Sequence, residues 1–147
     1  MKLPFLAAIL SLTATLAGAD PVKVASPFTV AETIDRLEAT VTGAGATVFA
    51  RINHAGGAES VGESLNPMEL LIFGNPKLGT AALQADPQAG MLLPLRVLAY
   101  QDTDGQVWLS YEQPVEMFEG FDVPADAMVV QKMTGALANL TAKALEN

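Results

Sequence analysis

The side chains best suited to chemistry are one histidine and a polar group that opens a helix. His54 is the only histidine, and it follows a strand-like segment into a Gly-rich stretch. An imidazole titrates near neutral pH, so His54 is a candidate general base or ligand contact. Asn75, Lys77 and Thr80 lie where a predicted helix begins, and free N–H groups with the helix dipole favour an anion there. These four residues form the predicted ligand-binding site.

Each of these residues also has a purely structural interpretation, and the sequence leaves both open. His54 can be a loop histidine that hydrogen-bonds to neighbouring backbone. Asn75 can act only as a helix cap, with Lys77 solvated and Thr80 an ordinary first-turn residue. Three acidic residues lie near the Gly-rich stretch and could set a carboxylate beside the imidazole, although nothing in the sequence fixes that geometry: Glu59, Glu63 and Glu69.

Other kinds of catalytic or metal chemistry find little support. One histidine and no cysteine leave few metal ligands, so we expect no metal site and no cofactor. The chain has no G-x-S-x-G pattern, and none of its serines has the context of an activated hydroxyl. The sequence leaves open whether the protein is an enzyme, and its residues favour a non-enzymatic protein.

The charge balance excludes several classes of partner. Eight basic and 16 acidic residues give a net charge of −8 at pH 7. Nucleic acids, heparin-like polymers and anionic membrane surfaces are bound by clustered Lys and Arg, and the few basic residues here are scattered. A small molecule or anion, or another protein, is the partner we expect.

Residues 1–19 have the pattern of a secretory signal peptide. Lys2 supplies the basic n-region, Leu3–Leu16 is mostly apolar, and Ala17-Gly18-Ala19 fits an A-x-A cleavage site. We expect cleavage after Ala19, export by the general secretory route to the periplasm, and a single domain over 20–147. Without Lys2 this domain has seven basic and 16 acidic residues, and it has no cysteine with which to form a disulfide.

Hydrophobic periodicity predicts a chain that alternates strands and helices. Helices are predicted from Thr29 to Gly43 or Gly45, from Pro76 to before Asp86-Pro87, briefly after Pro114, and over Pro124–Glu146. Strands are predicted over Pro21–Ser26, Thr47–Asn53, Leu70–Phe73, and the two arms of a hairpin that turns at Asp102–Gly105.

Two segments carry more specific expectations. The run Leu70–Phe73 has no polar alternation, which is typical of a strand buried on both faces. His54–Ser64 is predicted to be a Gly-rich loop with one helical turn around Glu59–Val61. On the hairpin, Trp108 and Tyr111 could stack a ligand or form a dimer contact, although aromatics on a sheet are more often core residues. The whole order predicts an α+β fold, with an antiparallel-rich sheet and helices packed on one face.

Several short motifs together resemble one protein family. They are Asn53-His54, Leu70–Lys77 (LLIFGNPK), Gly79-Thr80, Leu93-Pro94-Leu95 and Gly105-x-x-Trp108-x-x-Tyr111. This combination resembles the domain of unknown function 302 family over nearly the whole of 20–147. The resemblance implies a β-α-β4-α topology like that of the TATA-box-binding protein, and a homodimer. Members often have Asp where this chain has Asn53, which weakens any role that needs a carboxylate next to His54.

The leading hypothesis is an exported domain that binds a small polar or anionic ligand. Its site would combine His54 with the Asn75–Thr80 helix start, on the expectation that both lie at neighbouring strand ends and converge on one pocket. The alternatives are a small-substrate enzyme with His54 as acid or base and Lys77 stabilising negative charge, or a non-catalytic dimeric interaction module.

Overall fold

The computed structural model describes residues 20–146. The predicted signal peptide, 1–19, lies outside this range, so its cleavage and the export that follows stay predictions. Within the described range, no helix combines the length and apolar character that crossing a membrane requires.

Five antiparallel strands form one sheet, in the order β1-β5-β4-β3-β2. They are β1 (Val22–Ser26), β2 (Thr47–Asn53), β3 (Met68–Gly74), β4 (Leu95–Gln101) and β5 (Val107–Tyr111). The predicted hairpin joins β4 to β5. Its turn is fixed by the Asp102 carboxylate, which accepts hydrogen bonds from the N–H groups of Asp104 and Gln106, and by Gly105, whose φ is +84°.

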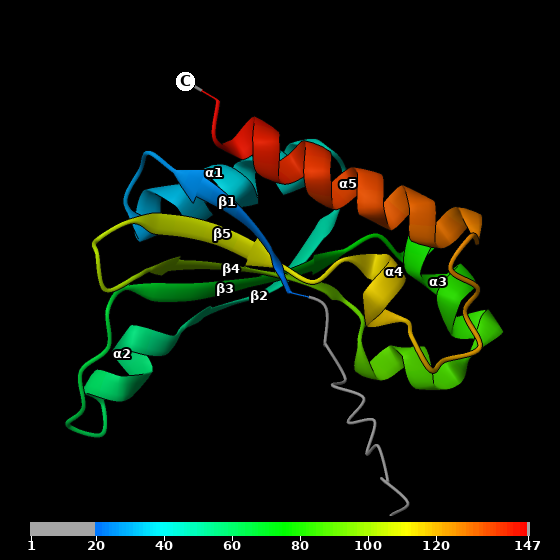
Figure 1. Ribbon diagram of the computed structural model, residues 1–147, viewed down its shortest axis with the longest axis horizontal. Helices are drawn as coiled ribbons and strands as arrows, with labels where there is room; N and C mark the ends of the chain where they lie inside the picture. The colour runs from blue at the N-terminus through cyan, green and yellow to red at the C-terminus, as the bar shows by residue number, and fades with distance from the viewer. Residues whose placement is uncertain (1–19, 147) are drawn as a thin grey trace, which may run out of the picture.

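Two long helices, α1 (Val30–Gly43) and α5 (Met128–Ala144), cover one face of this sheet (Figure 1). The Thr29 hydroxyl caps α1 by accepting the Glu32 N–H, and the 3.6-residue period then places Ile34 and Leu37 in the core. The order of elements and the one-sided packing confirm the predicted α+β, β-α-β4-α fold. The last helix begins at Met128 and not at Pro124, because Pro124–Ala127 close a turn through the Ala127 N–H and the Pro124 carbonyl.

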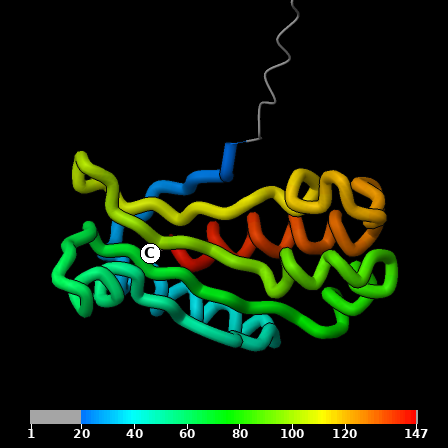
Figure 2. Tube along the Cα trace, turned by 90° about the horizontal axis from the view of Figure 1, so that it is seen from below, coloured from blue at the N-terminus to red at the C-terminus, as the bar shows by residue number. Residues whose placement is uncertain are grey.

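The expectation that the central strand is buried on both faces was wrong. In β3, Leu71 and Phe73 are buried under the helices, whereas Leu70 and Ile72 are only partly covered on the opposite face. Figure 2 looks onto that opposite face, with α1 and α5 behind the strands. The sequence run lacks polar alternation because the uncovered face of the strand is apolar as well.

The expected Gly-rich loop after β2 was also wrong in part. Residues His54–Glu59 form a short helix, α2, directly after the strand, and not a turn around Glu59–Val61. The Asn53 side chain starts it by accepting the Gly56 N–H at 2.8 Å. This Asn53 cap provides a local helix start despite the glycines at 56 and 57.

Three short helices gather at the other end of the sheet (Figure 1). They are α3 (Pro76–Ala85), the 3-10 helix η1 (Pro87–Met91) and α4 (Pro114–Met117). Asp86 joins them, because its carboxylate accepts the Gln88 N–H at the start of η1 and the Asp122 N–H from the segment after α4. This end of the molecule positions most of the polar residues predicted to form a site.

Candidate functional site

The structure separates His54 from the other predicted site residues. In the β2–β3 hairpin, Asn53 pairs with Glu69 and Thr47 pairs with Gly74. The two ends of the hairpin are therefore five residues apart along β3, about 17 Å at the rise of an antiparallel strand. His54 begins α2 at one end, and Asn75 follows β3 at the other (Figure 1).

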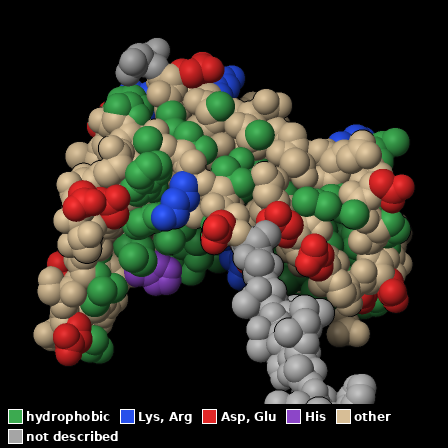
Figure 3. Space-filling model, viewed as in Figure 1, with side chains coloured by type: hydrophobic (Ala, Val, Ile, Leu, Met, Phe, Trp, Pro, Cys, Tyr) green, Lys and Arg blue, Asp and Glu red, His purple; other side chains and the backbone are tan. Residues whose placement is uncertain are grey.

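The expectation that His54 and the Asn75–Thr80 turn converge on one pocket was therefore wrong. An antiparallel hairpin brings the end of β2 beside the start of β3, not beside its end. In Figure 3 the histidine colour lies on the side where Figure 1 shows α2, away from α3 and α4. His54 is exposed, as the first residue of a six-residue helix.

The start of α3 leaves no N–H group free for an anion in its first turn. Pro76 has none to offer, and the Lys77 N–H donates to the Asn75 side chain at 3.0 Å. The Leu78 and Gly79 N–H groups both donate to the Asn75 carbonyl, at 2.8 and 2.9 Å. Asn75 therefore acts as a cap. The structure supports the structural interpretation of this turn and gives the predicted anion site no N–H donors there.

A cavity of about 280 Å³ opens beside this turn, and its lining is mostly apolar. We call it the α3–β4 cavity. It lies between α3, η1 and the segment that leads into β4, with contributions from β2, the end of β3 and α5. Its lining consists of Phe49, Gly74, Asn75, Pro76, Leu78, Gly79, Thr80, Leu83, Gly90, Leu93, Pro94, Leu95 and Met133. Of the four predicted site residues, Asn75 and Thr80 line it, and Lys77 and His54 do not.

Small residues keep this cavity open. Gly79 lies in the middle of α3, and a Cβ added there would come within 3.8 Å of Leu93, an ordinary van der Waals contact. A Cβ added at Gly90 would come within 3.5 Å of Leu83. Larger side chains at these positions would therefore extend into space that is now empty. The sequence carried a signal in the Gly79-Thr80 motif, but the walls come from segments far apart in the chain.

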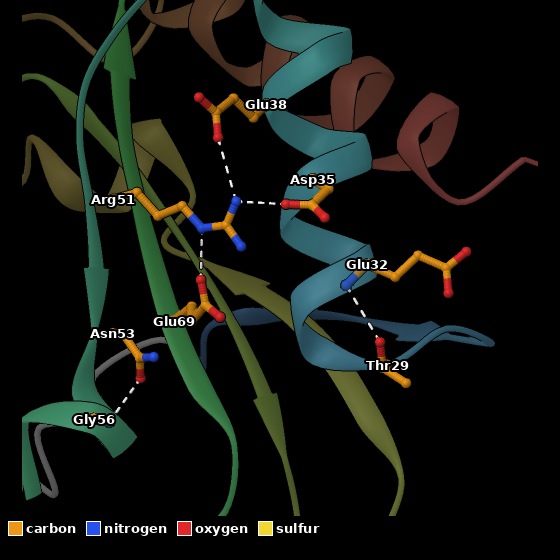
Figure 4. Close-up of polar contacts among 8 residues, drawn as sticks. All are labelled: Thr29, Glu32, Asp35, Glu38, Arg51, Asn53, Gly56 and Glu69. Atoms are coloured by element: carbon orange, nitrogen blue, oxygen red, sulfur yellow. Dashed lines mark hydrogen bonds and ion pairs between the residues drawn. The ribbon is translucent and has the colours of Figure 1, made fainter. Parts of the chain in front are cut away.

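Arg51 is at the centre of a polar group with three carboxylates, and sequence reasoning did not single it out. Its guanidinium bonds Glu69 at 2.6 Å and pairs with Asp35 and, at 3.5 Å, with Glu38 (Figure 4). The hydrogen bond with Glu69 is the largest cause that raises the pKa of Arg51 above its ordinary value. The group ties α1 to β2 and β3, so its role is structural.

The uncovered face of the sheet, which we call the open sheet face, is apolar and aromatic. The strand registers place these side chains on it: Lys23, Ala25, Ala50, Ile52, Met68, Leu70, Ile72, Arg96, Leu98, Tyr100, Trp108 and Ser110. The Trp108 indole N–H donates to the Asp102 carboxylate at 2.8 Å, and the Lys23 ammonium lies 5.7 and 6.0 Å from the Tyr100 and Trp108 ring centres. Tyr111, by contrast, is buried in the core.

Candidate ligands for a metal are dispersed in the part of the chain that the structure describes. No group of three or more His, Cys, Asp or Glu residues in 20–146 is arranged to hold a metal ion.

These features define a small α+β domain with an apolar cavity beside α3 and an uncovered sheet face. The chain belongs to the family described as "Domain of unknown function DUF302", whose model matches residues 22–140. An uncharacterised conserved protein of this family from Bacillus stearothermophilus has a similar crystal structure, with a TM-score of 0.68 and 20% identity, over 85% of this chain and 94% of that one. At this identity the likeness establishes the fold.

Curated relatives of this chain are longer proteins. A protein named "Fluoride-specific ion channel FluC 1" from Brucella suis biovar 1 (strain 1330) is 39% identical over 116 residues, which is 78% of this chain and 46% of that protein. A protein of the same name from Brucella abortus biovar 1 (strain 9-941) matches equally, over 43% of its length. The chain thus spans less than half of the curated relatives it matches.

Proposed function

We propose that this protein is an exported, non-catalytic domain that binds a small molecule in the α3–β4 cavity. The observation that carries the proposal is the cavity itself, about 280 Å³ and lined by residues from six parts of the fold. Ligand pockets are typically about 300–1,000 Å³, so this one is suited to a ligand smaller than a drug-sized molecule. Export is supported by the pattern of residues 1–19.

The lining supports binding over catalysis. None of the residues that line the cavity has a side chain that titrates or can be activated as a thiolate or amine. General acid–base catalysis needs such a group within hydrogen-bond reach of the substrate. His54, the candidate base of the enzyme alternative, lies at the opposite end of the β2–β3 hairpin.

The experiment compares two glycine variants after export. Gly79→Leu fills the cavity from α3, and Gly135→Leu makes the same change in α5, where an added Cβ meets nothing within 4 Å. Each full chain would be expressed with its own residues 1–19, purified from the periplasmic fraction without denaturants, and measured by native mass spectrometry.

We expect a mature chain beginning at Asp20, with an extra mass in the wild type and in Gly135→Leu that is absent from Gly79→Leu. An extra mass that persists in a folded Gly79→Leu protein, or a wild type that carries none and binds no probe, would refute the proposal. Retention of all chains in the cytoplasmic fraction would refute the export.

A second candidate function, a homodimeric interaction module, is favoured by the open sheet face. Large apolar side chains dominate this face. Ile52, for example, is 38% exposed. Contiguous apolar surface of this kind marks interaction sites. The matching region forms less than half of its longer relatives. This also suits a domain that packs against other protein surfaces.

The test of this candidate is the mass in solution. Leu98 lies at the centre of the open sheet face, and Ala142 is exposed on α5 on the other side of the molecule. We expect sedimentation to give a dimer for the wild type and for Ala142→Glu, and a folded monomer for Leu98→Glu. A wild type that stays monomeric at high micromolar concentration would rule out the homodimer.

A further inference from the structure

We infer that the α3–β4 cavity selects a compact, uncharged ligand: a single ring or short chain with at most one neutral hydrogen-bonding group. The inference rests on the proposed function and names the ligand class for that site. It replaces the polar or anionic ligand expected from the sequence, and four features of the cavity carry it.

The first feature is the absence of charge in the lining. Eleven of the 13 lining residues are apolar or glycine, and the two polar ones, Asn75 and Thr80, are uncharged. Moving a charge from water into apolar surroundings without a partner is disfavoured. The cavity is open at its mouth, where Asn75 and Thr80 are exposed, so a carboxylate or phosphate among the apolar side chains would lose part of its hydration. It would gain no cation in return, because Lys77 lies outside the lining.

The second feature is the use already made of the α3 N-terminus. An anion at a helix start is held by N–H groups that lack intrahelical partners. Here the Lys77, Leu78 and Gly79 N–H groups all donate to Asn75. An incoming anion would have to break the Asn75 cap in order to reach them.

The third feature is size. The cavity, about 280 Å³, is nearly twice the engineered apolar cavity of about 150 Å³ that takes up benzene. A substituted ring or a short chain fits it, and a lipid with two acyl chains does not. At its rim Phe49 and Leu83 are 55% and 39% exposed, so apolar side chains also flank the entrance.

The fourth feature is the position of the two polar residues. Asn75 is the N-cap of α3 and Thr80 lies in its second turn, so the polar lining is gathered on one side. The Thr80 hydroxyl donates its proton to the Pro76 carbonyl at 2.7 Å, and it keeps lone pairs that can accept a hydrogen bond. The apolar part of a ligand would then lie against Leu93 and Met133.

The test uses three probes of the same size class on the purified mature chain after any bound ligand is removed: toluene, benzyl alcohol and benzoate. Binding is measured by calorimetry at pH 7, with Gly135→Leu as the matched control for Gly79→Leu. We expect toluene and benzyl alcohol to bind the wild type and Gly135→Leu, and benzoate to bind at least about 10-fold more weakly than benzyl alcohol.

Two variants locate the contacts. Gly79→Leu should abolish binding of both neutral probes, and Gly79→Ala, which adds one methyl group, provides a milder change should the leucine variant fail to fold. Thr80→Val keeps the shape of the side chain and removes its hydroxyl. This variant should lower the affinity for benzyl alcohol by about 3- to 10-fold and leave the affinity for toluene unchanged.

The results separate this inference from the proposed function. If benzoate binds as tightly as benzyl alcohol and Gly79→Leu still blocks both, the ligand class is overturned and the site stands. If the neutral probes bind Gly79→Leu and the wild type equally, the α3–β4 cavity is not the site and both proposals fail.

Discussion

Replacing Arg51 with alanine tests how α1 is fastened to the sheet. The Arg51 guanidinium bonds Glu69 on the neighbouring strand at 2.6 Å and also reaches Asp35 and Glu38 on α1 (Figure 4). Removing it takes away these contacts and leaves three carboxylates close together. We therefore expect the free energy of unfolding to fall.

The size of the effect follows from burial. Hydrogen bonds to charged groups contribute about 1.5–3 kcal/mol, and exposed ion pairs about 0–1 kcal/mol. The Glu69 side chain is 13% exposed and the Arg51 side chain is 31% exposed, so this pair is neither fully buried nor fully exposed. We expect Arg51→Ala to cost about 2 kcal/mol, and Glu69→Gln in the same protein to restore part of it by removing one unpaired carboxylate.

Urea unfolding of a chain that comprises residues 20–147, followed by circular dichroism, measures this cost. The matched control is Arg96→Ala, because Arg96 makes one 3.5 Å ion pair with Glu112 and both side chains are well exposed, at 43% and 61%. The control should cost less than about 0.5 kcal/mol. If Arg51→Ala costs no more than Arg96→Ala, the account of how α1 is held is wrong.

Three further outcomes are expected. Thr29→Ala removes the α1 cap and should cost about 1 kcal/mol in the same urea assay; no change would mean that the cap does not form in solution. Gly79→Ala and Gly135→Ala should each stabilise the protein by about 0.5–1 kcal/mol, because both glycines lie inside helices with room for a Cβ; a destabilised Gly79→Ala would contradict the open cavity. The indole N–H of Trp108 lowers the pKa of the Asp102 carboxyl below its ordinary value. The stabilisation from this bond is therefore complete above the ordinary carboxyl pKa and is lost as the pH falls through the lower folded value. The fluorescence of Trp108, the chain's one tryptophan, should change in that acid range in the wild type and not in Asp102→Asn, and equal titrations would contradict the contact.

Features encoded by neighbouring residues could be predicted from the sequence. The Thr29 cap and the apolar periodicity after it predicted α1, and the Asp102–Gly105 turn predicted the β4–β5 hairpin. Each signal lies within a few residues of the structure it forms. The Asn75-Pro76 signal likewise gave the start of α3. The sequence did not show that Asn75 accepts hydrogen bonds from the Lys77, Leu78 and Gly79 N–H groups. Only the structure revealed these bonds.

The errors came from features that depend on distant parts of the chain. Leu70 and Ile72 look like core residues because the uncovered face of β3 is as apolar as the covered one. His54 and Asn75 are both at strand ends, but only the register of β2 with β3 shows that these ends are opposite. The cavity was missed because Phe49, Gly79 and Met133 meet only after folding.

The central claim is that the α3–β4 cavity holds a small uncharged ligand, and a high-resolution crystal structure of the protein tests it most directly. The protein would be purified from cells that produce it naturally, under mild conditions and without ligand exchange. We predict compact density between Gly79, Leu93 and Met133, with any polar atom towards Asn75 or Thr80. A cavity that contains only water, or ligand density at His54 and the open sheet face instead, would contradict the account.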